Sequence, residues 1–262
     1  MKEKWTDGDA YEMYVGRWSR KVGAGFLNWL AAPIGVHWLD LGCGTGALTS
    51  QILELNNPAS VIGVEPSAEF LALATQQLRD PRVQFRRGTA GALPLEENSA
   101  QLAVSGLVLN FISDVGGAMR ELIRVTQPGG IIASYVWDYA GHVQFMRYFW
   151  DAAVALNPAD REKDEGVRFP ICRPVALRRL FEAAGLKDIS VGAVDITTEF
   201  ENFEDYWLPF LSGIGPAPGY CMALDETTRT KLKERIRESL PTDPDGIILL
   251  AARAWAVKGT IP

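Results

Sequence analysis

Hydrophobic positions in the first half of the chain form short runs, separated by segments that have the spacing of helices. Five runs are almost uninterrupted, as in strands buried on both faces. The strands predicted from them span Val36–Leu41, Val61–Val64, Val83–Phe85, Leu102–Val104 and Ile131–Trp137. Between them, apolar residues three or four positions apart predict helices, for example over 47–55 and 67–78. Strands that alternate with helices of about 10–15 residues indicate βαβ units, so the pattern predicts an α/β fold with a parallel sheet.

The pattern is different on either side of this alternation. Before it, Tyr11, Tyr14, Val15 and Trp18 share one helical face, which predicts an N-terminal helical cap over residues 1–35. After it, the remaining segments predict a single domain over 36–262 with two lid insertions, at 139–174 and 200–243. The first insertion contains a segment, 157–174, that reads as a polar loop. The charged helix near residue 230 is expected to present a solvated face, with partner binding as the less favoured interpretation.

Composition narrows the possible classes of protein. The 262 residues carry a net charge of −6, and the 26 Lys and Arg residues form no dense run, which disfavours nucleic acid as a partner. The three cysteines are far apart, which favours a reducing cytoplasm, and two histidines cannot form a histidine-rich metal site. The most apolar stretch, Gly246–Val257, contains Arg253 and is shorter than the ~20 residues that a membrane-spanning helix needs. We therefore expect no metal, no membrane span and a small-molecule substrate.

The most specific feature is a glycine-rich loop after the first predicted strand. Asp40 lies near the end of that strand, and Gly42, Gly44 and Gly46 follow before a helix begins. Glycine permits positive φ and a close approach of a ligand to the backbone, while the first turn of a helix offers unpaired N–H groups. The pattern predicts a ligand-binding loop.

Two classes of ligand fit this loop. Gly42, Gly44 and Ala47 match the G-x-G-x-x-A pattern of dinucleotide-binding proteins, in which an acid follows about 20 residues later, as Glu65 does. Asp40, however, would repel a pyrophosphate and attract an amino group. No residues suited to hydride transfer are evident downstream. The loop therefore favours a ligand with an amino group and leaves a nicotinamide dinucleotide as the alternative.

Several motifs together resemble the class I S-adenosylmethionine-dependent methyltransferases. They are DLGCGTG at 40–46, VIGVEPS at 61–67, GTAGALPLEENS at 88–99, VLNFISD at 108–114 and RVTQPGG at 124–130. The series is most similar to the small-molecule branch that includes ubiquinone and menaquinone biosynthetic methyltransferases, and it covers about 36–137. The resemblance implies a Rossmann-like, three-layer αβα sandwich. Its seven-stranded sheet would be mostly parallel, with an antiparallel last strand and helical lid insertions.

The resemblance also implies the cofactor, S-adenosylmethionine, and the residues that bind it. These are Tyr14, Arg17, Asp40, Gly42, Cys43, Gly44, Glu65, Pro66, Thr89, Ala90 and Leu107. Asp40 and the glycine-loop backbone would receive the amino-acid end of the cofactor. Glu65, at the end of the second strand, has two carboxylate oxygens that can accept both ribose hydroxyls. Tyr14 and Arg17 would touch the cofactor's carboxylate, and Leu107 would lie beside the cofactor.

The adenine end departs from the family pattern. Pro66 would lie against the adenine, and Thr89 and Ala90 would face its edge. Relatives usually carry an acid where Thr89 stands, and a hydroxyl accepts a hydrogen bond without a charge. Weaker cofactor binding is therefore expected, and a cofactor-binding scaffold without activity stays open as an interpretation.

No residue is strongly indicated as a catalytic base. Asn110 occupies a position where many relatives have histidine, and an amide cannot accept a proton near neutral pH. Asp138, Tyr139 and His142 follow the fifth predicted strand, at the edge where open α/β sheets bind ligands, and are the weak candidates. The aromatic residues of the two insertions suggest an apolar lid over a planar or greasy acceptor.

The sequence thus predicts methyl transfer by in-line displacement from S-adenosylmethionine to a small, apolar or aromatic acceptor. An NAD-dependent oxidoreductase and a catalytically silent scaffold are the alternatives. The identity of the acceptor and the oligomeric state do not follow from the sequence.

Overall fold

The computed structural model describes residues 12–262, so the predicted helical position of Tyr11 lies outside the described residues. The chain forms two compact units. The sheet unit contains residues 19–136, 171–194 and 254–262, and the aromatic unit contains residues up to Trp18, 137–170 and 195–253. Each unit is therefore assembled from segments that are distant in the sequence, and most of both predicted insertions belongs to the aromatic unit.

The central element is a seven-stranded sheet in the order β3-β2-β1-β4-β5-β7-β6. Its strands are β1 (His37–Leu41), β2 (Ser60–Glu65), β3 (Val83–Arg87), β4 (Ala100–Gly106), β5 (Thr126–Trp137), β6 (Lys187–Phe200) and β7 (Ile248–Thr260). The first five strands pair in parallel. β7 is antiparallel to β5, because the N–H of Gly129 donates to Ile261 near one end and that of Asp138 to Arg253 near the other. This confirms the mostly parallel sheet with an antiparallel last strand.

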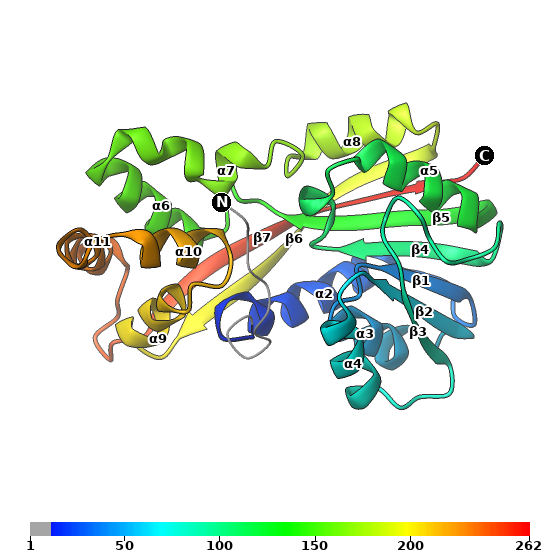
Figure 1. Ribbon diagram of the computed structural model, residues 1–262, viewed down its shortest axis with the longest axis horizontal. Helices are drawn as coiled ribbons and strands as arrows, with labels where there is room; N and C mark the ends of the chain where they lie inside the picture. The colour runs from blue at the N-terminus through cyan, green and yellow to red at the C-terminus, as the bar shows by residue number, and fades with distance from the viewer. Residues whose placement is uncertain (1–11) are drawn as a thin grey trace. The chain divides into compact units, whose positions relative to one another are not determined.

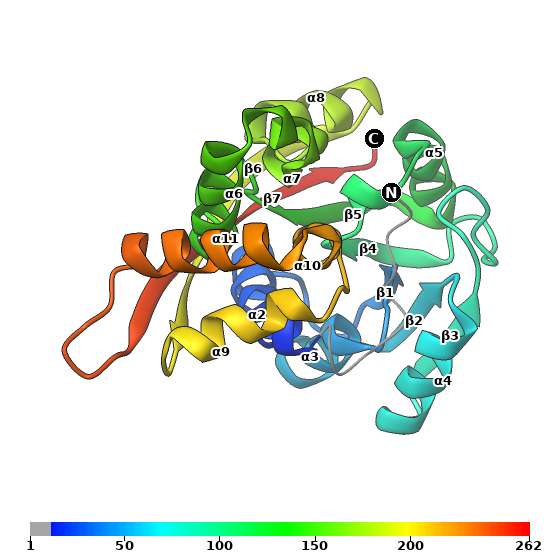
Figure 2. The same ribbon diagram turned by 60° about the vertical axis from the view of Figure 1, so that its left-hand side comes forward.

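Helices on both faces of the sheet complete three layers. In Figures 1 and 2, α3 and α4 lie on one face and α5 and α8 on the other. The bounds are α2 (Arg17–Leu30), α3 (Ala47–Asn56), α4 (Ala68–Gln77), α5 (Val115–Val125) and α8 (Pro174–Ala183), with a short 3-10 turn, η2 (Leu109–Phe111). The side chains of Ser67 and Asp114 cap α4 and α5 by accepting from backbone N–H groups, as the sequence predicts.

One predicted strand boundary is wrong. The sequence pattern predicts that the fifth strand begins at Ile131, but β5 begins at Thr126, so Pro128–Gly130 lie inside it. The pairing of β4 with β5 shifts there: Ala100 is opposite Thr126, whereas Leu102 is opposite Ile131. The Pro-Gly-Gly segment therefore forms an irregularity within the strand. The conformational freedom of the two glycines permits it, and Gly129 has a φ of 75°.

The aromatic unit consists mainly of helices. They are η1 (Glu12–Gly16), α6 (Gln144–Leu156), η3 (Pro158–Lys163), α7 (Glu165–Arg168), α9 (Phe203–Trp207), η4 (Leu208–Leu211), α10 (Pro216–Ala223) and α11 (Glu226–Ser239). The polar loop predicted over 157–174 is wrong, because η3 and α7 form there. The side chains of Asn157 and Asp164 accept hydrogen bonds from Ala159 and Gly166. Polar residues that read as loop residues thus serve as helix caps.

Aromatic side chains form the core of this unit. Phe149 and Phe210 stack with ring centroids 4.5 Å apart and an interplanar angle of 9°. Tyr206 donates its hydroxyl hydrogen to the carbonyl of Phe145 at 2.7 Å. All four residues are buried. Much of the aromatic content of the predicted insertions therefore stabilises the unit itself.

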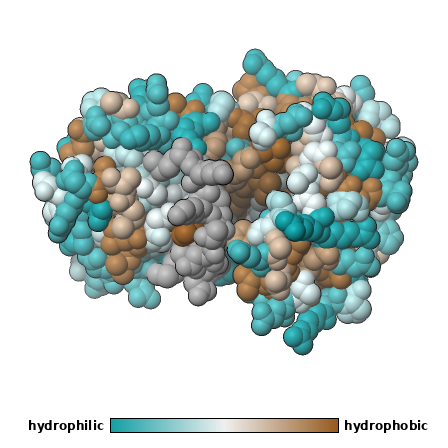
Figure 3. Space-filling view, viewed as in Figure 1, coloured by the Kyte–Doolittle hydropathy of each residue, from teal (hydrophilic) through white to brown (hydrophobic). Residues whose placement is uncertain are grey.

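The charged helix α11 presents a solvated face, as expected. Leu232 and Ile236 are buried under it, while Lys233 and Arg237 pair with Glu204. The surface at this helix, on the left of Figure 3, is largely hydrophilic. Over residues 12–262, no helix combines the length and the apolar character that crossing a membrane requires.

Candidate functional site

The glycine loop is fixed by its backbone to the end of β2. The N–H groups of Gly42 and Cys43 both donate to the carbonyl of Val64, at 2.8 and 3.2 Å. Gly42, Gly44 and Gly46 have φ of 73°, 55° and 87°. L side chains rarely adopt such values, so the alternation of glycines in the sequence follows from the path of this loop.

The three glycines differ in what surrounds them. A Cβ added at Gly42 would lie 2.6 Å from Val108, and one at Gly46 would lie 2.8 Å from Leu78. A Cβ added at Gly44 would meet no atom of the described residues within 4 Å. Packing therefore requires two of the glycines, whereas Gly44 leaves bare backbone next to open space, where a ligand can approach.

Asp40 is a buried acid directly before the loop, with a relative exposure of 1%. The hydroxyl of Thr49 donates to its Oδ2 at 2.7 Å. Burial raises the pKa of Asp40 to about 6; the hydrogen bonds from Thr49 oppose this shift, and the negative charge of Glu65 adds to it. None of the described groups that shift this pKa is a cation. A buried acid that lies close to a second acid suits a positively charged ligand.

Glu65 ends β2 and is held by backbone donors. Its Oε1 accepts from the N–H of Ser67 at 3.0 Å, and its Oε2 accepts from the N–H of Gly44 at 3.3 Å. A carboxylate oxygen has capacity for more than one hydrogen bond, so both oxygens can accept further donors. The N–H of Gly44, predicted to bind the cofactor, orients Glu65 in this structure. The result is a fixed pair of acceptors at the carboxyl edge of the sheet.

The other predicted residues of the sheet unit lie at the same edge. Glu65 is opposite Arg87 in the pairing of β2 with β3, so Pro66 and Thr89 follow the ends of neighbouring parallel strands. Pro66 and Thr89 are exposed, and Ala90 is half-buried. Open α/β sheets bind ligands at this edge, so the structure brings the predicted adenine contacts to the same edge as the predicted ribose contact.

The end of β4 adds polar groups that the sequence did not single out as binding residues. Leu107 follows the strand with φ of 61°, an unusual conformation for leucine. Close to it, the side-chain oxygen of Ser105 and both polar atoms of the Asn110 amide are buried and have no hydrogen-bond partner among the described residues. The sequence feature that could have indicated Asn110 as a binding residue is its position as a polar residue inside the apolar run VLNF. Its donor and acceptor are free for a ligand.

Tyr14 and Arg17 belong to the aromatic unit. Arg17 donates from Nη1 to both oxygens of Asp205, at 3.0 and 3.2 Å, while its Nε and Nη2 are buried and have no partner among the described residues. Tyr14 packs edge-on against Phe145 and Phe210. Arg17 thus keeps two donors for an anion, and Tyr14 keeps its hydroxyl.

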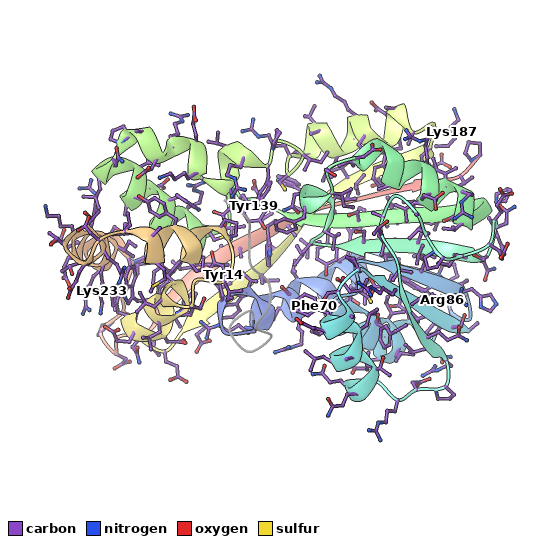
Figure 4. All side chains as sticks on the ribbon, viewed as in Figure 1. Tyr14, Phe70, Arg86, Tyr139, Lys187 and Lys233 are labelled. Atoms are coloured by element: carbon purple, nitrogen blue, oxygen red, sulfur yellow. The ribbon has the colours of Figure 1, made fainter. Side chains whose placement is uncertain are left out.

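The three candidate bases are also in the aromatic unit. The Oδ2 of Asp138 accepts from the backbone N–H of His142 at 3.2 Å and lies 3.5 Å from its Nδ1. Asp138 therefore stabilises the turn that follows β5. The side chain of His142 is 56% exposed. Tyr139, labelled in Figure 4, is buried against Phe169, with ring centroids 5.5 Å apart. These contacts give each residue a structural role and leave their catalytic role a prediction.

Known proteins are similar to this chain in sequence and in fold. Residues 39–134 match the family model described as a methyltransferase domain. A demethylmenaquinone methyltransferase from Lactiplantibacillus plantarum is 43% identical over 98 residues, which cover 36% of this chain and 41% of that protein. A malonyl-[acyl-carrier protein] O-methyltransferase from Pectobacterium atrosepticum is 32% identical over 155 residues, 59% of each chain. The chain thus spans about half the length of the curated relatives it matches.

The fold is also similar to that of a solved methyltransferase. The phosphoethanolamine N-methyltransferase 2 of Haemonchus contortus, in complex with S-adenosyl-L-methionine, superposes with a TM-score of 0.59. The match covers 97% of this chain and 56% of that one, at 16% identity. At this identity the likeness concerns the fold.

Proposed function

We propose, since the chain belongs to the class I S-adenosylmethionine-dependent methyltransferases, that it transfers a methyl group from S-adenosylmethionine to a small acceptor. One observation carries this proposal. Asp40 is buried near the charge of Glu65, and Glu65 is held by the N–H of Gly44, where the backbone is open. A ligand with a cationic amino group and a pair of hydroxyls fits these two acids.

The chain's own residues bind and orient the reactants. We expect Asp40 to bind the ammonium group of the cofactor and Glu65 to accept its two ribose hydroxyls. Arg17, whose Nε and Nη2 have no partner among the described residues, suits the carboxylate, whereas the nearby charge of Glu165 makes the Tyr14 hydroxyl a poor site for a second negative charge. When bound, S-adenosylmethionine supplies a methyl group that is already activated on a sulfonium, so positioning the acceptor can account for much of the rate.

The proposed acceptor is small and apolar or aromatic. The aromatic core of the unit that carries both predicted insertions supports this choice, because planar molecules stack on aromatic rings. The net charge of −6 supports a small molecule over a nucleic acid. The three cysteines are buried and far apart in the sequence, which supports a reducing cytoplasm as the location.

Calorimetry with two ligands tests the assignment of the two acids. S-adenosylhomocysteine has the amino-acid end, and 5′-methylthioadenosine lacks it. We expect Asp40→Asn to lower the affinity for the first ligand alone, and Glu65→Gln to lower it for both. Each loss should be about 10- to 100-fold, since hydrogen bonds to charged groups contribute ~1.5–3 kcal/mol. Exposed Glu69 supplies the control, Glu69→Gln, which should change neither affinity.

The alternatives give different results in related assays. Tight binding of NAD, without binding of S-adenosylhomocysteine, would overturn the proposal in favour of an oxidoreductase. Incubation with methyl-labelled S-adenosylmethionine and a cell extract separates an enzyme from a silent scaffold. The proposal expects label in a small-molecule product. Bound cofactor without any transfer of label would favour the scaffold.

A further inference from the structure

The aromatic unit buries an acid that the proposed function does not use. Glu165 is the first residue of α7, and its relative exposure is 1%. The indole N–H of Trp150 donates to its Oε2. The nearby cation Arg147 already forms a bidentate pair with Asp164, at 3.0 and 2.7 Å. Burial raises the pKa of Glu165 more than the charge of Arg168 lowers it, and Glu165 forms no ion pair within residues 12–262.

Tyr14 is a second buried polar group in the same unit. Its relative exposure is 3%, and its hydroxyl has no hydrogen-bond partner among the described residues. Burial raises the pKa of Tyr14, and the charge of Glu165 is the next largest cause, followed by Tyr139, Tyr206 and Cys221. Tyr14 and Glu165 therefore lie near each other, yet no hydrogen bond joins them. Figure 4 labels Tyr14 and Tyr139, two residues of the aromatic unit.

Ring contacts place both groups at one aromatic cluster. The Tyr14 ring lies 5.4 Å from that of Phe210, which stacks on Phe149 at 4.5 Å. Phe149 contacts Trp150 at 5.3 Å, and Trp150 donates to Glu165. Buried hydroxyl and carboxyl groups nearly always have hydrogen-bond partners in folded proteins. A buried carboxylate and a nearby buried hydroxyl that has no partner among the described residues, both at aromatic rings, match a ligand with a polar group on an aromatic ring.

We propose that Glu165 and Tyr14 bind the hydroxyl of a phenolic methyl acceptor, and that Glu165 takes the proton of that hydroxyl. This inference rests on the proposed function, because it specifies the chemistry of the acceptor. The phenol would donate to Glu165 and accept from Tyr14, while its ring contacts the aromatic cluster. A carboxylate at this place would be repelled by Glu165, which assigns Tyr14 to the acceptor rather than to the cofactor's carboxylate.

The chemical step balances with these groups. The proton leaves the phenol oxygen for Glu165, and the oxygen forms a bond to the methyl carbon. The bond between that carbon and sulfur breaks, and its electron pair stays on sulfur, so the products are a methyl ether and a neutral thioether. Glu165 then releases its proton to solvent. Burial raises the pKa of Glu165 to about 7, which suits a group that accepts a proton near neutral pH.

Two naphthalene probes test this inference on the full chain. 2-Naphthol has the hydroxyl, whereas 2-methoxynaphthalene has the same rings and no donor, and both are fluorescent. We expect the protein to bind 2-naphthol about 10-fold more tightly, as a hydrogen bond to a charged group predicts. Glu165→Gln should remove the preference and Tyr14→Phe should reduce it. Glu162→Gln, at an exposed glutamate of the neighbouring η3, should retain it.

Two readouts separate failure of this inference from failure of the proposed function. Equal binding of the two probes, or a preference that Glu165→Gln leaves intact, would overturn the role of Glu165. S-adenosylhomocysteine should bind the Glu165→Gln variant with unchanged affinity, which also reports that the variant is folded. If the parent protein binds 2-naphthol selectively but no S-adenosylhomocysteine, the phenol site stands and the methyl-transfer proposal fails.

Discussion

The sheet unit and the aromatic unit each contain a buried acid whose pKa is raised by burial, Asp40 and Glu165, and the surroundings of the two acids are assembled differently. Asp40 takes a hydrogen bond from Thr49, nine positions later in the same strand-loop-helix segment. Glu165 takes one from Trp150, on a different helix, and lies near Tyr14 at the start of the described chain. Burial raises the pKa of both, to about 6 and about 7.

The difference explains what each acid suits. Asp40 lies close to a second acid and beside open backbone, so a cation is the ligand that lowers its energy. Glu165 lies beside a phenol and aromatic rings, so a neutral proton donor with a planar ring is the better match. The surroundings of Asp40 are therefore formed by a local sequence motif, whereas those of Glu165 depend on tertiary packing.

The largest expected effect is on the pH dependence of folding. The pKa of Glu165 is raised from 4.5 to about 7, so the folded state binds its proton more tightly than the unfolded state. Stability should then fall as the pH rises from about 4.5 to about 7. Replacing the acid with an amide removes this penalty, so Glu165→Gln should increase the free energy of unfolding by ~3 kcal/mol near pH 8.

Urea denaturation at about pH 5 and about pH 8 measures this effect. Asp40→Asn provides the comparison: the pKa of Asp40 is raised from 3.8 to about 6, so its stability loss should occur between those values. If Glu165→Gln instead destabilises the protein equally at both pH values, burial of the charged carboxylate does not reduce the stability of the parent protein, and the prediction is wrong.

The same contrast shows how much the sequence could predict. The glycine loop, Asp40 and Glu65 were found because consecutive residues define a strand end, a bend and a helix start. Glu165 was missed because it belongs to DREKDEG at 160–166, which reads as a solvated charged segment. Asp160 and Asp164 of this segment are buried too, with Tyr220 and Arg147 as partners from other helices. Charge in a short window cannot reveal partners that tertiary packing supplies.

The fold followed the same rule. The sequence predicts strands β1 to β4 to within a few residues. β1, β2 and β4 are largely buried, so their apolar runs are nearly continuous, whereas β3 lies at the sheet edge and is partly exposed. The helices of residues 158–168 were not predicted, since they are short and start at caps that also occur in loops. The helices of residues 158–168 therefore depend on long-range packing, whereas the strands follow from the local pattern of hydrophobic residues.

Two glycine substitutions in the sheet unit separate packing from ligand binding, and we expect their effects on stability to be intermediate in size. Gly46→Ala places a Cβ 2.8 Å from Leu78 at a positive φ and should cost ~2 kcal/mol of stability. Gly44→Ala meets no atom of the described residues within 4 Å, so it should cost only ~1 kcal/mol for its backbone conformation. S-adenosylhomocysteine should nevertheless bind the Gly44→Ala variant much more weakly, because the added methyl occupies the space beside the open backbone.

Thermal denaturation and calorimetry on both variants provide the test. A Gly44→Ala variant that binds S-adenosylhomocysteine as well as the parent would show that the ligand does not approach the loop at this residue. The Gly46→Ala variant controls for general damage to the loop, since its defect should appear mainly in stability.

The smallest expected effect concerns Thr89, at the carboxyl edge after β3. It stands where the family resemblance leads us to expect an acid, and its side chain is exposed. Thr89→Asp should therefore raise the affinity for 5′-methylthioadenosine, which retains the adenine, by about 3-fold, since exposed charges contribute ~0.2–1 kcal/mol. Thr75→Asp, on the exposed face of α4, adds the same charge to the same unit and should leave the affinity unchanged. A gain at Thr89 alone would mean that the local motif in the sheet unit extends to the adenine edge. No gain would mean that the local motif consists only of Asp40, the glycine loop and Glu65. Adenine binding would then depend on residues that tertiary packing brings to the site, as the surroundings of Glu165 do.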